Sequence, residues 1–211
     1  MHRLTDLSAA SWLTAADADP MRLITFGPAG FPAYARLRFI PDPAGPGMSE
    51  ADAVLPDDHP SEIEQSRTVL LALGDGAEPC FFCVWEGYEG SFLAPDLLRG
   101  PLVELPHRRY VLFAGALGEI AAWEGHFGGG RPCPPPAFAW PADHRWCFTS
   151  DVDPHWAGIG ASATAIDALT ARTDVDAVPA RPDQPPPAYD SWRESCVRPP
   201  HRTSGPCARC P

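Results

Sequence analysis

Lysine is absent from this chain of 211 residues, and all 16 basic side chains are arginine. A Schiff-base mechanism and a P-loop phosphate site each need a lysine, so both are excluded. The chain also lacks the Gly-x-Ser-x-Gly motif of serine hydrolases, and no stretch matches a catalytic signature well. The known motifs therefore point to no particular enzyme.

Basic charge is scarce as a whole, because 27 acidic residues face 16 basic ones and the formal net charge is -11. Binding to a phosphate backbone needs a basic footprint, so we expect no nucleic-acid partner. An acidic chain of this kind is expected to be soluble and to attract a basic protein.

Long apolar runs are missing too. No run approaches the 18 residues that would suggest a membrane span, and the polar start at residues 1–6 has no secretory apolar region. We expect no membrane partner. Seven cysteines without such a signal predict a cytoplasmic protein with mostly reduced thiols.

The hydrophobic patterning predicts an α+β domain with a mostly antiparallel sheet flanked by a few helices. Ser61 and Glu64 form a capping box before one helix, and Ser162 is the expected N-cap of another. Helices are expected over 7–16, 61–73 and 162–172, and residues 118–123 suit a helix or a strand. Strands are expected over 21–26, 34–40, 80–85, 102–105, 110–114, 145–149, 156–159 and 175–178, with a loop over 127–136.

Composition divides the chain at about residue 180. Residues 1–180 are predicted to form a single α+β domain. Residues 181–211 are rich in proline, arginine and cysteine and are predicted to be a flexible tail, because they carry too little apolar surface to fold alone.

Three tryptophans, three aspartates and two histidines lie within residues 140–162. In a strand, Asp151, Asp153 and His155 would share one face, where they would suit a divalent metal or an acid–base pair. Pro154 favours the alternative of a polar turn whose Asp side chains bond the local backbone. We take these three residues, with Trp140 and Trp156, as candidate binding residues.

Trp85 and Glu86 stand before a Gly-rich turn and complete the candidate binding set. The indole ring of Trp85 beside the Glu86 carboxylate would exclude water and could form a recognition pocket. The alternative, which is commoner, is a core Trp followed by a turn. The Gly158–Ser162 stretch suits an anion site at a helix start, or a simple turn from strand to helix.

The cysteines suggest zinc in one place. Cys80 and Cys83 lie in an apolar run and are interpreted as core residues. The tail offers four ligands of the right types within 15 residues, but a tail with incidental cysteines is the favoured interpretation, and we predict no metal and no cofactor. The four tail residues are Cys196, His201, Cys207 and Cys210.

Residues 80–88, 105–115, 140–146 and 151–169 resemble an uncharacterised actinobacterial family, over roughly residues 30 to 180. That family has no established activity to carry over. More distantly, the order of a Y-x-L-F-x-G strand, a Trp-Pro pair, an Asp-rich turn and a Gly turn before a helix is similar to SMI1/KNR4-type (SUKH-like) immunity proteins. This resemblance implies an α+β binding module that neutralises a toxin partner.

We therefore expect a protein-binding module, immunity-like in type, whose acidic and aromatic surface meets a basic partner. The sequence leaves its oligomeric state open. The alternative is a small-molecule or metal-dependent enzyme that uses Asp151, Asp153 and Glu86. An enzyme of that kind would bring the three carboxylates together in a concave pocket.

Overall fold

The computed structural model describes residues 1–17, 19–88, 92–127, 129 and 133–190. The strands are β1 (His2–Arg3), β2 (Ala33–Arg38), β3 (Pro79–Trp85), β4 (Val103–Leu105), β5 (Arg108–Ala116), β6 (Phe138–Pro141), β7 (Cys147–Thr149), β8 (Trp156–Ala161) and β9 (Ala177–Ala180). The α-helices are α1 (Ser11–Thr14), α2 (Pro20–Phe26), α3 (Glu62–Leu73), α4 (Trp123–His126) and α5 (Ala163–Thr170). Short 3₁₀ helices cover Ser8–Ala10, Glu50–Asp52, Leu97–Arg99 and Leu117–Ala122.

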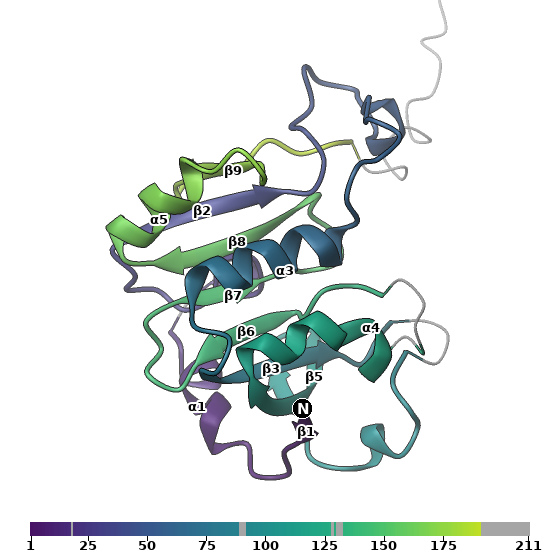
Figure 1. The fold of residues 1–211 in the computed structure, drawn as a ribbon, viewed down its shortest axis with the longest axis vertical. Coiled ribbons are helices and arrows are strands. Elements are labelled where there is room, and N and C mark those ends of the chain that lie inside the picture. The colour runs from purple at the N-terminus through teal and green to yellow at the C-terminus, as the bar shows by residue number, and fades with distance from the viewer. Residues whose placement is uncertain (18, 89–91, 128, 130–132, 191–211) are drawn as a thin grey trace, which may run out of the picture.

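These described strands form one nine-stranded sheet in which all paired strands run antiparallel (Figure 1). Their order is β1-β5-β3-β6-β7-β8-β2-β9, and β4 pairs with β5 beside this path. The predicted α+β class with a mostly antiparallel sheet is confirmed.

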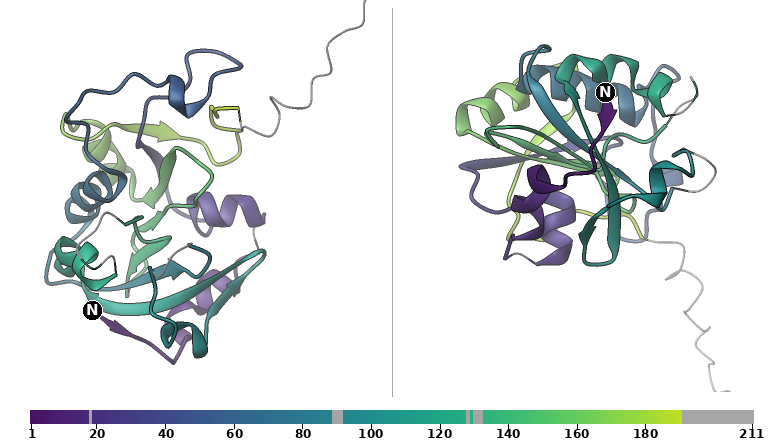
Figure 2. Two further views of the ribbon diagram at one scale, coloured as in Figure 1. Left: turned by 90° about the vertical axis from the view of Figure 1, so that its right-hand side faces the viewer. Right: turned by 90° about the horizontal axis from the view of Figure 1, so that it is seen from below.

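Helices cover both faces of the sheet (Figure 2). Helices α3, α4 and α5 lie over one face, where Phe82 belongs to the larger hydrophobic core. Helices α1 and α2 lie over the other face, where the neighbouring Cys83 belongs to a second core. The two adjacent residues of β3 enter different cores because side chains alternate along a strand.

Local signals set the two long helices as predicted. The backbone N–H and hydroxyl of Ser61 both donate to Glu64 Oε2, at 2.8 and 2.6 Å, which confirms the capping box at the start of α3. The Ser162 hydroxyl accepts from the Ala165 N–H at 3.2 Å and caps α5. The predicted pair of strands around Pro106 is also confirmed as β4 and β5, and His107 takes a positive φ of 64° in their turn.

The strand predicted over 21–26 is wrong, because this segment is helix α2. Asp19 accepts a hydrogen bond from the Arg22 N–H at 3.1 Å, and Pro20 occupies the first helical turn. An Asp-Pro pair is a helix-start signal, and here it overrides the strand preference of Ile24 and Thr25.

Gly158 and Gly160 do not form a turn, since the strand predicted over 156–159 continues as β8 to Ala161. A Cβ at Gly158 would overlap the carbonyl oxygen of Thr25, and one at Gly160 would overlap the ring of Phe31. Glycine at position 158 therefore lets helix α2 lie directly against strand β8.

Both edges of the sheet are short. Strand β1 has two residues, and β4 on the same side has three. At the opposite edge, β9 contains Pro179, whose register partner is Ala35 of β2.

Strand β9 ends at Ala180, directly before the first residue of the predicted tail. Of the segment predicted as a tail, the structure describes 181–190, and these residues bond back to the domain. The Tyr189 hydroxyl donates to the Pro41 carbonyl at 2.6 Å, and the Asp190 N–H donates to the Met48 carbonyl at 2.8 Å.

Candidate functional site

Arg108 joins three of the predicted site residues at one end of β5. Its guanidinium donates to both oxygens of Asp151, at 3.0 and 3.1 Å, and to Asp153 at 3.3 Å. It also lies 5.0 Å from the ring centroid of Trp85. The hydrogen bond to Asp151 raises the pKa of Arg108, which therefore stays charged and neutralises the buried carboxylate.

Glu86 belongs to a different pair. Its carboxylate accepts from Arg109 Nε at 2.6 Å. Arg108 and Arg109 are neighbours in β5, so their side chains leave opposite faces of the sheet. Glu86 is therefore separated from Asp151 and Asp153. Arg109 binds Glu86 on one face of the sheet, and Arg108 binds the two aspartates on the other. This arrangement lacks the convergence that the enzyme hypothesis requires.

Residues 151–155 form an irregular turn between β7 and β8 rather than a strand, as the polar-turn alternative expects, but the carboxylates of Asp151 and Asp153 bond Arg108 instead of the local backbone. They separate as a result: Asp151 points to Arg108, whereas His155 Nε2 lies 3.1 Å from Asp42 Oδ1. No group of three His, Cys, Asp or Glu suited to a metal ion occurs among the described residues.

Asp42 is the centre of a second buried network, which sequence reasoning missed. Its carboxylate accepts from Arg36 at 2.7 and 2.9 Å and from Arg38 at 3.2 Å, in addition to the His155 contact. Burial acts to raise the pKa of Asp42, but the hydrogen bonds from Arg36 and His155 outweigh it and hold that pKa well below its usual range.

The network supports the aromatic residues around it. The Arg36 guanidinium lies 5.5 Å from the ring centroid of Trp156, and its side chain is only 8% exposed. The His155 ring meets Tyr189 edge to face at 4.9 Å. Arg36 and Arg38 share one face of β2, and Asp42 follows soon after; this spacing was the only sequence signal for the network.

The prediction that Trp140 is a binding residue is wrong. Trp140 is fully buried in strand β6, which we did not predict, and packs against Trp12 and Phe81 at 5.8 Å between ring centroids. It offers no surface to a ligand and serves as core.

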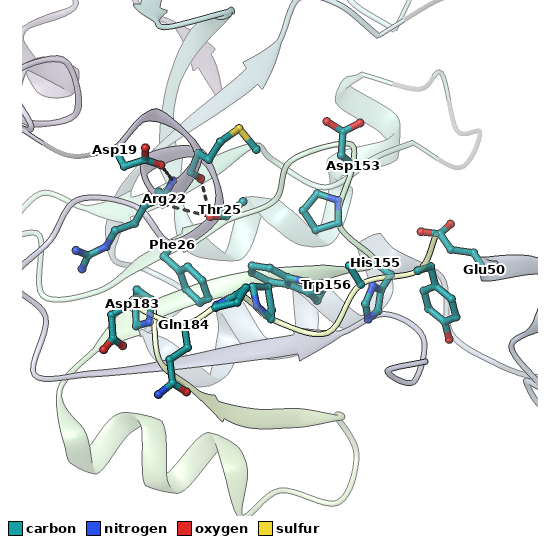
Figure 3. A pocket seen from close by; sticks show the side chains of 17 residues that line it. Asp19, Arg22, Thr25, Phe26, Glu50, Asp153, His155, Trp156, Asp183 and Gln184 are labelled. Atoms are coloured by element: carbon teal, nitrogen blue, oxygen red, sulfur yellow. Dashed lines mark hydrogen bonds between the residues drawn. The ribbon is translucent and has the colours of Figure 1, made fainter. Parts of the chain in front are cut away.

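Asp153, His155 and Trp156 line a pocket of about 430 Å³, which we call the acidic pocket (Figure 3). Helix α2, the turn before β8, the 3₁₀ helix at Glu50 and segment 182–189 form its walls. Its lining residues are Asp19, Met21, Arg22, Thr25, Phe26, Glu50, Asp153, Pro154, His155, Trp156, Pro182, Asp183, Gln184, Pro185, Pro186, Ala188 and Tyr189.

The pocket has an apolar floor and an acidic rim. Figure 3 shows the rings of Phe26, Trp156 and His155 in a row, with the carboxylates of Asp19, Glu50, Asp153 and Asp183 around them. Arg22 is the one arginine among the described residues of the lining. The rim therefore carries an excess of negative charge over an aromatic and proline-lined floor.

Two of the four rim carboxylates have neither an ion pair nor a helix-capping role within the described ranges. Asp19 caps helix α2 and Asp153 contacts Arg108, whereas Glu50 and Asp183 form no ion pair with any residue in the described ranges. Met21, which is 57% exposed, adds an adaptable apolar side chain to the rim.

Cys80, Cys83 and Cys147 are buried core thiols, as expected for the first two. Burial raises the pKa of Cys80 to about 12, so this thiol is inert at neutral pH. The tail zinc hypothesis on Cys196, His201, Cys207 and Cys210 lies outside the described residues.

No protein-family model matches the sequence, and neither a curated protein nor a solved structure matches the chain. In the part of the chain that the structure describes, no helix has the length and apolar character needed to cross a bilayer.

Proposed function

We propose that this protein is an immunity-like binding module that neutralises a basic partner by taking a basic segment of it into the acidic pocket. One observation carries the proposal: an apolar pocket of about 430 Å³ whose rim holds four carboxylates and one guanidinium. That volume lies in the range of roughly 300–1,000 Å³ in which proteins bind ligands.

The chemistry of the pocket suits an arginine or lysine side chain. The stem of such a side chain is apolar and packs on rings and prolines, while its charged head reaches water or a carboxylate. Trp156 and Phe26 supply the apolar surface, and Glu50 and Asp183 supply negative charge that no described cation neutralises. A guanidinium also stacks on aromatic faces, which favours arginine over lysine.

The charge of the whole chain supports the same partner. A net charge of -11 attracts a basic protein over distances comparable to the Debye length and raises its association rate. The resemblance to SMI1/KNR4-type proteins agrees with a neutralising role, and the reduced thiols of Cys80, Cys83 and Cys147 agree with a cytosolic location.

The test uses a fluorescein-labelled peptide of alternating arginine and alanine as a probe, with its glutamate counterpart as reference. Fluorescence anisotropy should show binding of the arginine peptide alone, weaker at high salt. In a chain whose arginines in residues 191–211 are changed to serine, so that they cannot compete with the probe, the double variant Glu50→Gln/Asp183→Asn should bind about tenfold more weakly, because each exposed ion pair contributes up to about 1 kcal/mol.

A matched control removes the same charge elsewhere. Glu104 and Asp167 are exposed, lie away from the pocket and form no ion pair with a described residue. Glu104→Gln/Asp167→Asn should leave probe affinity within about twofold, whereas Met21→Ser should weaken it through lost apolar contact. Equal weakening by both double variants would refute the pocket as the binding site.

A further inference from the structure

The chain itself contains a basic segment, residues 191–211, directly after the last described residue, which follows a residue of the pocket wall. Tyr189 lines the pocket, and Asp190, the last described residue, is held by its hydrogen bond to Met48, two residues from Glu50. Residues 191–211 continue from this point. The last described residue thus follows a residue of the pocket wall and is bonded near Glu50.

The charge of this segment is opposite to that of the pocket. Residues 191–211 contain four arginines and one acidic residue, Glu194, in a chain whose remainder is strongly acidic. Of the described residues that line the pocket, four are acidic and one is arginine. The arginines of the segment are Arg193, Arg198, Arg202 and Arg209.

The length of the segment makes the contact accessible. Twenty-one residues reach at most about 70 Å when extended. This reach is more than enough for their arginines to enter a pocket whose wall includes the residue next to the attachment point. A short tether also gives an effective concentration on the order of 1 mM. If the free segment bound the pocket with a dissociation constant of only about 0.1 mM, the tethered segment would occupy it most of the time at this effective concentration.

We propose that residues 191–211 occupy the acidic pocket in cis through their arginines and compete there with the basic segment of a partner. This inference rests on the proposed function, because it assigns a competitor to the same site. The module then binds a partner only when that partner outcompetes the tethered segment. Free protein is thereby protected from weak, unspecific basic ligands.

The test compares full-length chains with the arginine–alanine probe. Changing the four arginines of the segment to serine removes the competitor and should tighten probe binding about tenfold. This factor is the ratio of the effective concentration to the dissociation constant of the free segment. A matched variant loses the same positive charge at exposed sites away from the pocket and should tighten binding less than threefold. Its substitutions are Arg99→Ser, Arg109→Ser, Arg145→Ser and Arg172→Ser.

A second measurement uses a synthetic peptide of residues 191–211. Added in trans to the chain with the four tail serines, it should displace the probe, and its four-serine counterpart should not. With Glu50→Gln/Asp183→Asn added to the same chain, binding of the labelled 191–211 peptide should weaken about tenfold.

The outcomes separate the two proposals. If the probe binds through Glu50 and Asp183 but the tail serines leave its affinity unchanged, cis competition is overturned and the proposed function stands. If no chain binds the probe but the 191–211 peptide binds through those carboxylates, cis occupancy stands and the basic partner is overturned. If neither peptide binds, both proposals fall.

Discussion

The buried network around Asp42 gives a sharp test of how the pocket is held together. The substitution Asp42→Asn removes the negative charge that Arg36 and Arg38 bind, while both arginines stay positively charged. Removing one partner of a buried charge pair costs about 3–5 kcal/mol. Asp42 is 19% exposed, and the side-chain oxygen of asparagine can still accept hydrogen bonds, so we expect a loss of about 2–3 kcal/mol in unfolding free energy at pH 7.

The pH dependence follows from the lowered pKa of Asp42. A carboxyl with a depressed folded pKa stabilises the fold fully above the unfolded value of about 3.9. That stabilisation is lost as pH falls through the folded pKa. Asparagine does not titrate, so the stability difference between wild type and variant should shrink steadily below about pH 4.

Urea unfolding followed by tryptophan fluorescence measures both effects, and Asp176→Asn is the matched control. Asp176 is 44% exposed, and Arg38 is the one described residue that donates to its carboxylate, so its loss should cost less than about 1 kcal/mol. The reasoning fails if Asp42→Asn costs no more than Asp176→Asn, or if its deficit is as large at about pH 2 as at neutral pH.

Three further outcomes are expected. Ser61→Ala removes the hydroxyl of the α3 capping box and should cost about 1 kcal/mol in urea unfolding; an unchanged midpoint would contradict the role of the cap. Gly158→Ala places a Cβ against the Thr25 carbonyl and should lower the free energy of unfolding by about 3 kcal/mol. If the variant were as stable as the wild type, helix α2 would not need to lie this close to strand β8. Cys80, with its pKa raised to about 12 by burial, should resist iodoacetamide in the folded protein and react after unfolding, as peptide mass spectrometry can establish.

Much of the fold was predictable because its signals are local. The capping residues Ser61 and Glu64 lie three positions apart, and the apolar runs of β3 and β5 needed no distant partner to be recognised. Helix α2 was missed because the β-branched residues Ile24 and Thr25 favour a strand, while the Asp-Pro pair that starts the helix is a signal of only two residues. Strand β6 was missed because its four residues follow a proline-rich stretch typical of a loop.

The candidate site was predictable only in part. The sequence singled out Asp153, His155 and Trp156, which do line the acidic pocket. It gave no sign of Glu50 or Asp183, because these residues come from segments more than a hundred positions apart and meet only in the folded chain. Arg108 was likewise missed, since its carboxylate partners lie more than forty residues away.

The short edges of the sheet limit how any partner attaches. A foreign strand joins a sheet by hydrogen bonds to a free edge, and Pro179 in β9 lacks an N–H to contribute. The other edge offers only the two residues of β1 and the three of β4. Recognition by strand addition is therefore disfavoured on both sides, and the same two edges protect concentrated protein from sheet-to-sheet polymerisation.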